Sequence, residues 1–347
     1  MINFAVLGVG RIGKIHAQNV HQNRKCTLKV VADPWIEGTD QLAKELNCGT
    51  EYDYFKAIER DDVDAILIGT PTEFHVSLML HAVRLGKPVL CEKPIDKEFQ
   101  LALDAVKEVE KYKGQVMLAF NRRFDPDTIA VKNAINANEI GDIRQVIITS
   151  RDPGLPSREY LKSSGGILKD MTIHDFDMAR FLLGEEPVQV QAIASRLVDP
   201  TIEEFDDYDS VMVLLKTKSG KQCVINGSRE AVYGFDQRLE VLGSKGMLRT
   251  ENHKENSLQR YSSTYTQAQE PLLNFFLERH ALSYKIELDK FIDAVTNNNS
   301  FCTTPFDGLM ALHIALCAEE AVRTGQVVKI NDLREEINNS NVGLTVA

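Results

Sequence analysis

The chain has 347 residues, of which 43% are hydrophobic and 26% charged, a composition typical of folded protein rather than of extended disorder. Its formal net charge of -10 argues against nucleic acid and anionic membrane surfaces as partners, because both carry negative charge. No apolar run approaches the ~20 residues that a membrane-spanning helix needs, and the length suits about two domains.

Six cysteines are spread along the chain, and none of them forms a Cys-x-x-Cys pair. The sequence therefore indicates neither a zinc site nor a redox dithiol. A chain of this length buries its own core without disulfides, so we interpret the cysteines as thiols in a reducing compartment. The amino terminus enters an apolar strand pattern at once, without the basic region or cleavage site of a secretion signal. We expect a cytoplasmic protein.

The first third of the chain alternates short apolar runs with longer amphipathic segments, a pattern that predicts strands alternating with helices. The apolar runs are nearly continuous Val, Ile, Leu and Ala, as expected when helices cover both faces of a sheet. We therefore predict a doubly wound parallel sheet of the Rossmann type in a domain of residues 1–121. The expected strands are 2–7, 27–33, 65–69, 88–91 and 115–120. The expected helices are 13–22, 40–46, 74–85 and 99–113.

From about residue 122 several strands follow one another without crossover helices. This order predicts a second α/β domain, residues 122–347, with a large open and mostly antiparallel sheet. Helices usually cover one face of such a sheet, and we expect a partner subunit on the other. The expected strands are 143–150, 188–197, 209–217, 222–228, 238–242 and 247–251. The expected helices are 126–137, 170–183, 272–297 and 305–324, the second of them preceded by a loop rich in Pro, Ser and Gly.

A glycine motif, GVGRIG at residues 8–13, follows the first strand directly and opens a helix. This context predicts a dinucleotide site, with the pyrophosphate at the helix amino terminus, rather than a glycine-rich turn without a ligand. Asp33 ends the second strand, where an acid accepts hydrogen bonds from the adenosine ribose and repels a 2′-phosphate. We therefore favour NAD over NADP, although Arg11 lies near enough to soften that preference. The predicted NAD-binding residues here are Gly8, Gly10, Arg11, Ile12, Gly13 and Asp33.

The segment Cys91-Glu92-Lys93-Pro94 lies at the carboxyl end of an expected strand, the edge of an open α/β sheet where ligands bind. Lys93 can place its ammonium near a reacting carbon there, and Pro94 can hold a cis peptide bond. Composition alone favours the alternative, a surface lysine at a strand end.

Several motifs together resemble the glucose-fructose oxidoreductase and inositol dehydrogenase (Gfo/Idh/MocA) family from residue 1 to about residue 324. Two of them, the segment 121–125 and the pair Gly165-Gly166 followed by 170–175, resemble bacterial inositol 2-dehydrogenases in particular. The motifs are GVGRIG at 8–13, Gly69-Thr70-Pro71 followed by His75, Glu92-Lys93-Pro94, Asn121-Arg122-Arg123-Phe124-Asp125, Gly165-Gly166 and Asp170-Met171-Thr172-Ile173-His174-Asp175.

The resemblance implies NAD-dependent oxidation of one ring hydroxyl of a cyclic polyol, with myo-inositol as the expected substrate, and usually a homotetramer. It implies a catalytic trio of Lys93, Asp170 and His174. It also implies polyol contacts from Asp152 and Tyr233, although some relatives carry Asn at the position of Asp152. Further residues implied to line the cofactor are Thr70, Pro71, His75, Glu92 and Asn121.

The chemistry of the trio agrees with this activity. Asp170 and His174 are four residues apart on one expected helix, which places them on the same face. A neutral imidazole, with an ordinary pKa of about 6.5, is a suitable base for the hydroxyl proton. Lys93 can stabilise the negative charge that develops on the same oxygen. Asp170 either orients His174 or binds a neighbouring hydroxyl, and the sequence leaves both roles open.

Other interpretations of these residues remain. Asp170, His174 and Asp177 share the spacing of a helical metal site, but no further ligands are indicated and we expect no metal. Asp170 as a helix cap and His174 as a core histidine form the plainer alternative. His75 is either close to the nicotinamide ribose or a polar residue at a helix start. We interpret the acidic residues 203–207 as a solvated loop.

Two other functions stay open. One is a scyllo-inositol or aldose dehydrogenase of the same family, because polar contacts to individual hydroxyls decide the substrate. The other is a non-catalytic regulator that senses NAD through this fold. The presence of Lys93, Asp170 and His174 together argues against the regulator.

Overall fold

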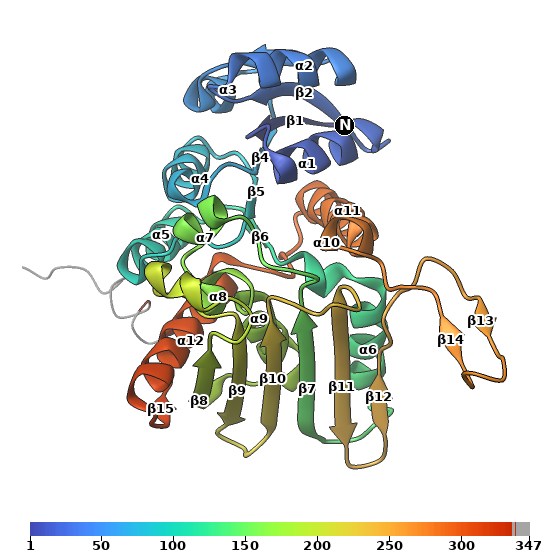
Figure 1. The fold of residues 1–347 in the computed structure, drawn as a ribbon. Coiled ribbons are helices and arrows are strands. Elements are labelled where there is room, and N and C mark those ends of the chain that lie inside the picture. The colour runs from blue at the N-terminus through green and yellow to red at the C-terminus, as the bar shows by residue number, and fades with distance from the viewer. Residues whose placement is uncertain (335–336, 338–347) are drawn as a thin grey trace, which may run out of the picture. The chain divides into compact units, whose positions relative to one another are not determined.

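The computed structural model describes residues 1–334 and residue 337. The chain forms two compact units (Figure 1). Unit 1 contains residues 1–121 and 284–312 together with the described residues from Leu333 onward, and unit 2 contains residues 122–283 and 313–332. The chain thus leaves unit 1 after Asn121 and returns to it near the carboxyl terminus, and the sequence does not predict that return.

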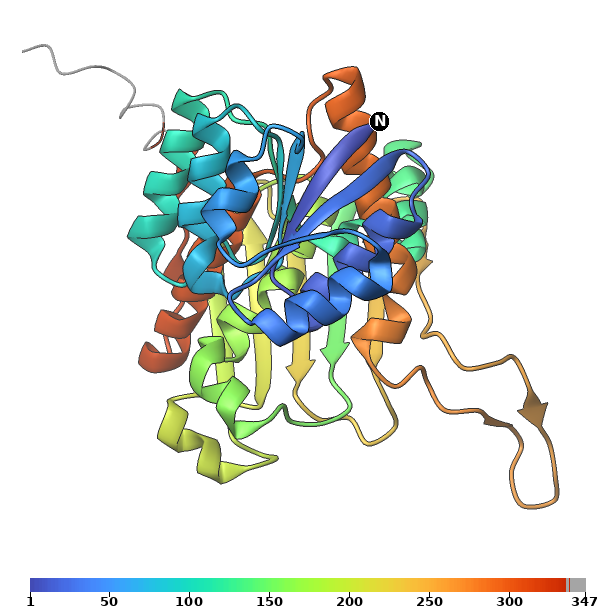
Figure 2. The same cartoon turned by 90° about the horizontal axis from the view of Figure 1, so that it is seen from above.

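Unit 1 is built on the expected parallel sheet. Its six strands lie in the order β3-β2-β1-β4-β5-β6, and every neighbouring pair is parallel. Helices flank the sheet on both sides (Figure 2), which is why β4, β5 and β6 consist only of buried residues. The strands are β1 Ile2–Leu7, β2 Cys26–Ala32, β3 Gly49–Glu51, β4 Ala65–Ile68, β5 Val89–Glu92 and β6 Val116–Ala119. The helices are α1 Arg11–Gln22, α2 Ile36–Leu46, α3 Tyr54–Glu59, α4 His75–Arg84 and α5 Phe99–Lys111, with short 3-10 turns at Thr72–Phe74 and Asn121–Phe124.

Most of helix α11 (Ala281–Asn297) and the first turns of helix α12 (Pro305–Thr324) complete unit 1. Phe291, in helix α11, packs against Phe4 of β1 with ring centroids 5.9 Å apart. Gly308, in the first turns of helix α12, lies against β6, where an added Cβ would come 2.3 Å from the Leu118 side chain. Residues from the last quarter of the chain therefore pack against this sheet.

Unit 2 is built on a seven-stranded sheet in the order β12-β11-β7-β10-β9-β8-β15. Its neighbouring strands are antiparallel except for β7 and β10, which are parallel, so the expected mostly antiparallel sheet is confirmed. The strands are β7 Ile143–Arg151, β8 Pro187–Ser195, β9 Ser210–Thr217, β10 Gln222–Ser228, β11 Asp236–Gly243, β12 Met247–Arg249 and β15 Val328–Lys329. The other elements are α6 Pro126–Asn136, α7 Arg158–Ser164, α8 Ile167–Asp170, α9 Ile173–Leu183, a 3-10 turn at Pro200–Phe205, α10 Phe276–Arg279, and a hairpin of β13 Gln259–Arg260 and β14 Ala268–Gln269 that projects from the sheet (Figures 1 and 2).

The two faces of this second sheet differ. Along β9 the side chains of Val211, Val213 and Leu215 are buried, whereas Met212 and Leu214 between them are exposed. Ile193 on the neighbouring β8 is 65% exposed. One face of the sheet is therefore packed and the other presents large apolar side chains to solvent.

The helix expected at 170–183 is two helices. α8 ends at Asp170, and α9 begins at Ile173. At the break the Thr172 N–H donates to the Ile167 carbonyl, five residues back, so the regular ladder is interrupted. The expectation that Asp170 and His174 lie on one continuous helix is therefore wrong.

Within the described part of the chain, no helix combines the length and the apolar character needed to cross a membrane.

Candidate active site

The turn between β1 and α1 has the geometry of a phosphate cradle. A Cβ at Gly13 would lie 1.9 Å from the Gly8 carbonyl oxygen, and Gly8 itself has a φ of +94°. A Cβ at Gly10 would meet nothing within 4 Å. Two glycines are thus needed for close packing, while Gly10 leaves open space. No side chain caps this end of α1, so the N–H groups at Arg11 and Ile12 face an open helix terminus that suits a pyrophosphate.

Asp33 lies at the carboxyl end of β2 and is held in place by the same turn. Its Oδ2 accepts hydrogen bonds from the Val9 N–H at 3.1 Å and from the Tyr54 hydroxyl at 3.1 Å. Its Oδ1 accepts from the Trp35 N–H at 2.9 Å. Burial, together with this carboxylate, raises the pKa of Tyr54 well above its usual range, so Tyr54 keeps the proton it donates.

The loop after β4 contains a buried histidine. His75 Nδ1 lies 2.7 Å from the Pro94 carbonyl oxygen, and its Nε2 lies 2.9 Å from the Thr70 carbonyl oxygen. The imidazole therefore links the Thr70-Pro71 turn to the segment that follows β5, where the Lys93-Pro94 peptide is cis. Burial lowers the pKa of His75, and a neutral ring donates to one of the two carbonyls only. The Thr70 hydroxyl oxygen is buried without a hydrogen-bond partner, a polar atom that a bound ligand would satisfy.

Lys93 follows Glu92, a carboxyl of unit 1 whose charge influences the buried Glu287. Glu92 ends β5; its Oε1 lies 2.7 Å from His16 Nε2, and its Oε2 accepts from the Lys93 N–H at 3.3 Å. Glu287 of α11 is fully buried, and neither of its carboxyl oxygens has a hydrogen-bond partner. Burial, reinforced by Glu92, raises the pKa of Glu287 well above its usual range. Asn121, at the end of unit 1, is also buried.

In unit 2, Asp170 and His174 lie on either side of the break between α8 and α9, and both are partly exposed. Asp170 is the last residue of α8, so it does not cap a helix amino terminus. Its Oδ1 accepts a hydrogen bond from the Tyr160 hydroxyl at 2.8 Å, and its Oδ2 lies 3.5 Å from Arg229 Nη1. The sequence alone does not point to Tyr160 or Arg229, because neither belongs to a local motif.

The acidic segment 203–207 is only partly a solvated loop. Asp206 is exposed, but Asp207 is 1% exposed and its Oδ2 accepts from Arg229 Nη2 at 3.1 Å. The solvated interpretation is wrong for Asp207, because its partner Arg229 comes from a strand end more than twenty residues later.

Two carboxyls of unit 2, those of Asp152 and Asp175, have raised pKa values. Burial of its carboxyl raises the pKa of Asp152 to about 6, against the lowering effect of the Arg122 and Arg229 cations. Burial likewise raises the pKa of Asp175 to about 6, although Arg122 Nη1 donates to its Oδ1 at 2.8 Å. Unit 2 therefore brings these carboxyls together with the guanidiniums of Arg122 and Arg229. Such perturbed groups concentrate at functional sites.

The segment 122–125 anchors the helices of unit 2. Arg123 Nε donates to Asp177 at 2.7 Å, and Arg122 binds Asp175, so two residues of α9 are held from this segment. Both oxygens of Asp177 bind Arg123, which is inconsistent with Asp177 as a metal ligand. No group of three or more His, Cys, Asp and Glu side chains within the described ranges is arranged to hold a metal ion.

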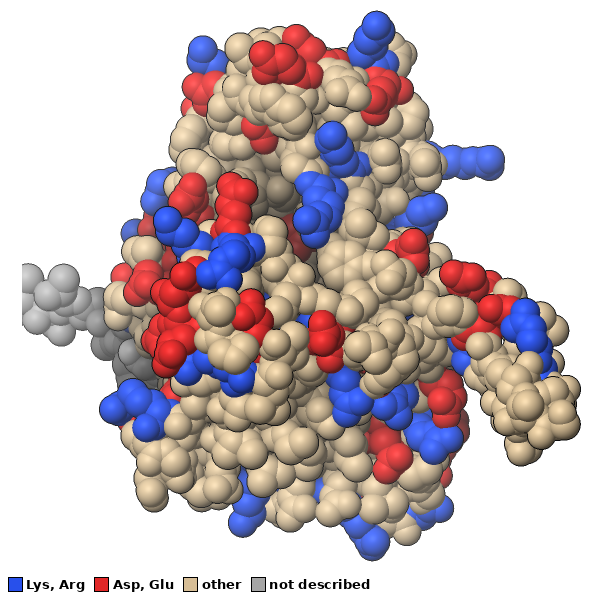
Figure 3. Space-filling model, in the orientation of Figure 1, with Lys and Arg blue, Asp and Glu red and all other residues tan. Residues whose placement is uncertain are grey.

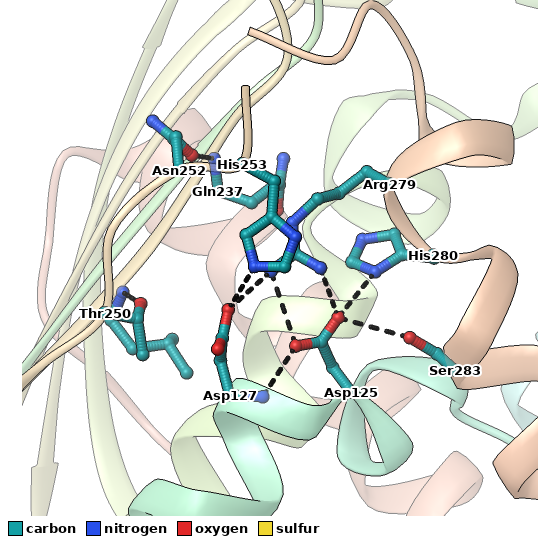
Figure 4. Close-up of polar contacts among 10 residues, drawn as sticks. Asp125, Asp127, Gln237, Thr250, Asn252, His253, Arg279, His280 and Ser283 are labelled. Atoms are coloured by element: carbon teal, nitrogen blue, oxygen red, sulfur yellow. Dashed lines mark hydrogen bonds and ion pairs between the residues drawn. The ribbon is translucent and has the colours of Figure 1, made fainter. Parts of the chain in front are cut away.

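Asp125 is the centre of a further buried network (Figure 4). Its Oδ2 accepts from Arg279 at 2.5 Å and from the Ser283 hydroxyl at 3.2 Å, and His280 Nδ1 also lies 3.2 Å away. Burial alone would raise the pKa of Asp125, but hydrogen bonds from His280 and Arg279 hold it below its usual range. This segment therefore stabilises the fold around the site.

Tyr233 lies in the loop between β10 and β11. Its hydroxyl donates to Asp236 Oδ2 at 2.7 Å and accepts from Arg151 Nη1 at 2.6 Å. An open groove of about 690 Å³ runs beside it, lined also by Asn252 and Leu272. Tyr233 is half exposed, so its ring is accessible from this groove.

Two family models match the chain. The oxidoreductase family with an NAD-binding Rossmann fold matches residues 2–120, and the GFO/IDH/MocA C-terminal domain matches residues 128–249. Together they cover more than half of the sequence.

Individual proteins are similar over nearly the whole chain. An inositol 2-dehydrogenase of Rhizobium meliloti (strain 1021) is 44% identical over 331 residues, which are 95% of this chain and 99% of that protein. The crystal structure of a myo-inositol dehydrogenase from Corynebacterium glutamicum superimposes with a TM-score of 0.93 at 40% identity, covering 96% of this chain and 99% of that one. A scyllo-inositol dehydrogenase from Lactobacillus casei, solved with NAD(H) and scyllo-inositol, gives a TM-score of 0.88 at 27% identity, covering 95% and 99%.

Proposed function

Because the chain belongs to the Gfo/Idh/MocA family of oxidoreductases, we propose that it is an NAD-dependent inositol 2-dehydrogenase. The reaction is the oxidation of one ring hydroxyl of myo-inositol to the 2-keto-inositol. The observation that carries this proposal is the 44% identity to an inositol 2-dehydrogenase over 95% of the chain. A dinucleotide cradle in unit 1 and two carboxyls with raised pKa values in unit 2 each support it.

The proposed cofactor is NAD, which supplies the hydride acceptor when bound. The open space at Gly10 and the uncapped amino terminus of α1 fit a pyrophosphate. The carboxylate of Asp33 suits ribose hydroxyls and disfavours a 2′-phosphate. The buried Thr70 hydroxyl, which lacks a partner in the protein, fits a site that a ligand completes. Further residues assigned to the cofactor are Gly8, Arg11, Ile12, Gly13, Pro71, His75, Glu92 and Asn121.

The proposed catalytic groups are Lys93, Asp170 and His174. His174 takes the proton of the reacting hydroxyl as general base. Lys93 donates a hydrogen bond to the same oxygen and stabilises its developing negative charge. Asp170 accepts a hydrogen bond from a neighbouring hydroxyl of the polyol; its carboxylate also accepts from the Tyr160 hydroxyl and lies 3.5 Å from Arg229.

Asp152 and Tyr233 are proposed to bind other hydroxyls of the polyol. A carboxyl with a pKa of about 6 is mostly ionised at pH 7 and accepts hydrogen bonds from hydroxyl groups. The Tyr233 ring is accessible from its groove while its hydroxyl is fixed by Asp236. Contacts of this kind decide which stereoisomer is oxidised, because an unpaired polar group in the site is costly.

The test is a panel of polyols mixed with the protein and NAD, followed by NADH absorbance. We expect turnover with myo-inositol. Turnover with scyllo-inositol or an aldose in its place would support the second candidate, which the Lactobacillus casei relative favours. Tight NAD binding without any turnover would contradict the dehydrogenase proposal and favour an NAD-sensing regulator.

We also propose a homotetramer in the cytoplasm. The sheet of unit 2 exposes a row of large apolar side chains, which a second copy of the chain would cover: Ile147, Ile193, Met212, Leu214 and Leu242. Figure 3 shows Lys and Arg interspersed with Asp and Glu on the face it presents, and the net charge is -10. These charges support a small-molecule substrate rather than a nucleic acid or a membrane surface. The proposed homotetramer is tested by light scattering, which measures the molar mass of the purified protein in solution.

A further inference from the structure

Arg229 is a buried cation placed between two carboxylates of unit 2. It follows β10 directly, and its backbone N–H donates to the Asp209 carbonyl at 2.7 Å. Its side chain is 1% exposed and is the largest of the fully buried side chains in the described chain. A buried guanidinium needs paired anions, since its desolvation is costly. Asp207 and Asp170 are those anions, at 3.1 Å and 3.5 Å.

The two carboxylates lie at opposite ends of α8. Asp207 Oδ1 accepts the N–H of Ile167, the first residue of the helix, at 2.7 Å. Asp170 is the last residue of the same helix. Gly166 precedes the helix with a φ of +87°, and a Cβ there would come 3.2 Å from Asp207 Oδ1. Arg229 and Asp207 therefore clamp the short helix at both ends, and that helix carries Asp170.

The clamp also sets the charge around Asp170. Asp207 is 1% exposed and already binds two backbone N–H groups, those of Ile167 and Tyr208. Asp207 shares the guanidinium with Asp170, which keeps Arg229 from neutralising Asp170 completely. A partly compensated carboxylate remains a strong acceptor, and the Tyr160 hydroxyl occupies one of its oxygens from the exposed side.

On this geometry we propose that Arg229, acting with Asp207, is a positioning residue that holds Asp170 as the acceptor for a substrate hydroxyl. The proposal rests on the proposed polyol dehydrogenase function and adds to it two residues outside the catalytic trio. It requires that Arg229 influence the reaction through Asp170, beyond any contribution to stability.

The test compares Arg229→Lys with Arg180→Lys. Arg180 is a second buried arginine of unit 2, on α9, and is bound to Glu186 at 2.6 Å and 2.7 Å. A lysine keeps the charge but not the planar fork that reaches two carboxylates. We expect kcat/KM for myo-inositol to fall about 10–100-fold in Arg229→Lys, with the Kd for NAD unchanged, because hydrogen bonds to charged groups are worth that much. Arg180→Lys should lower the melting temperature without this loss.

The pH profile of kcat/KM separates positioning from mere stability. Arg229→Met removes a cation, which raises the pKa values of the groups that must be deprotonated for activity. The acid limb of the profile should therefore move to higher pH. Asp207→Asn leaves the guanidinium to Asp170 and Asp152, so the acid limb should move downward. Circular dichroism identifies any variant that fails to fold, and the remaining variants then decide the matter.

Two outcomes overturn the proposal by itself: an active wild type whose kcat/KM and acid limb are unchanged in Arg229→Lys and Asp207→Asn, or activity losses equal to those of Arg180→Lys at equal loss of stability. An inactive wild type with every polyol overturns the proposed function and this inference together.

Discussion

The carboxylate of Asp33 accepts a hydrogen bond from the backbone N–H of Val9 at 3.1 Å. Val9 lies in the glycine turn and Asp33 ends the neighbouring strand, so one bond fixes the two parts of the predicted nucleotide site relative to each other within unit 1. The pyrophosphate cradle and the ribose acceptor are therefore preformed, which lowers the ordering cost of binding.

Asp33→Ala should weaken NAD binding by about 10–100-fold, because the ribose hydroxyls lose a charged acceptor. The ratio of NADP to NAD affinity should rise at the same time. Titration of protein fluorescence with each dinucleotide measures both effects. Asp40→Ala removes an exposed carboxylate that binds Tyr52 nearby and should leave both affinities as they are. Unchanged NAD affinity in Asp33→Ala would place the ribose elsewhere.

Gly10→Ala should impair NAD binding, whereas Gly13→Ala should impair the stability of the fold. A Cβ at Gly10 meets nothing within 4 Å, so Gly10→Ala should fold normally but obstruct the dinucleotide. A Cβ at Gly13 would overlap the Gly8 carbonyl, so Gly13→Ala should cost several kcal/mol of stability, on the order of other severe core overlaps. Thermal melts with and without NAD distinguish the two variants. Normal NAD-induced stabilisation of Gly10→Ala would contradict the assigned cradle.

Lys93→Met should retain NAD affinity while kcat/KM for the polyol falls by about 10²–10³ or more, because a donor to the developing alkoxide is lost. Lys97→Met, four residues further along the same loop, serves as the matched control and should remain active. Steady-state kinetics and NAD titration provide the two measurements. Normal turnover by Lys93→Met would refute the assigned role.

His174→Asn should reduce turnover by about 10²–10⁴, the usual contribution of a positioned general base. The control is His253→Asn, since His253 is exposed and pairs with Asp127 in a different part of unit 2. Stopped-flow measurement of NADH formation gives the rate. A loss smaller than tenfold would mean that another group removes the proton.

Glu287→Gln should stabilise the protein at neutral and alkaline pH. The unfolded carboxyl loses its proton above a pKa of about 4.3. The buried carboxyl has a pKa raised well above its usual range and keeps its proton to higher pH. Stability therefore falls as the pH rises from the unfolded pKa towards the folded pKa, and Gln removes this decline.

The measurement is the melting temperature of Glu287→Gln and wild type between pH 5 and pH 8. We expect a difference that grows with pH, with about 2 °C or more for each kcal/mol gained. Glu37→Gln, on the exposed side of α2, should show no such trend. A constant difference across this range would show that Glu287 is ionised throughout.

The sequence predicts the sheets well, because unbroken apolar runs and alternating runs each have one explanation. Strand β10 was expected at 222–228 and is found at Gln222–Ser228. The sequence does not predict the break before Ile173, since the residues on both sides of the break are apolar and helical in composition. Nor does the sequence predict the short helix α7, because the Pro, Ser and Gly residues around it suggest turns.

The candidate site was predictable where the chemistry is local. The turn at 8–13, Asp33 and the segment 92–94 follow directly from strand ends. Arg229 and Asp207 were not predictable, because a buried ion pair between distant loops leaves no periodic signal in the sequence. A single arginine after a strand looks like any surface residue until its burial is known.

Because Phe291 packs on Phe4, the hydrophobic core of the nucleotide-binding unit is complete only after α11 has been synthesised. Synthesis proceeds from the amino terminus, and early segments usually fold as soon as they emerge from the ribosome. Here β1 packs against α11, a helix near the other end of the polypeptide. Residues 1–121 therefore leave the ribosome before the helix that covers one side of their hydrophobic core has been synthesised. A truncated gene product ending before α11 would expose that apolar side and should aggregate.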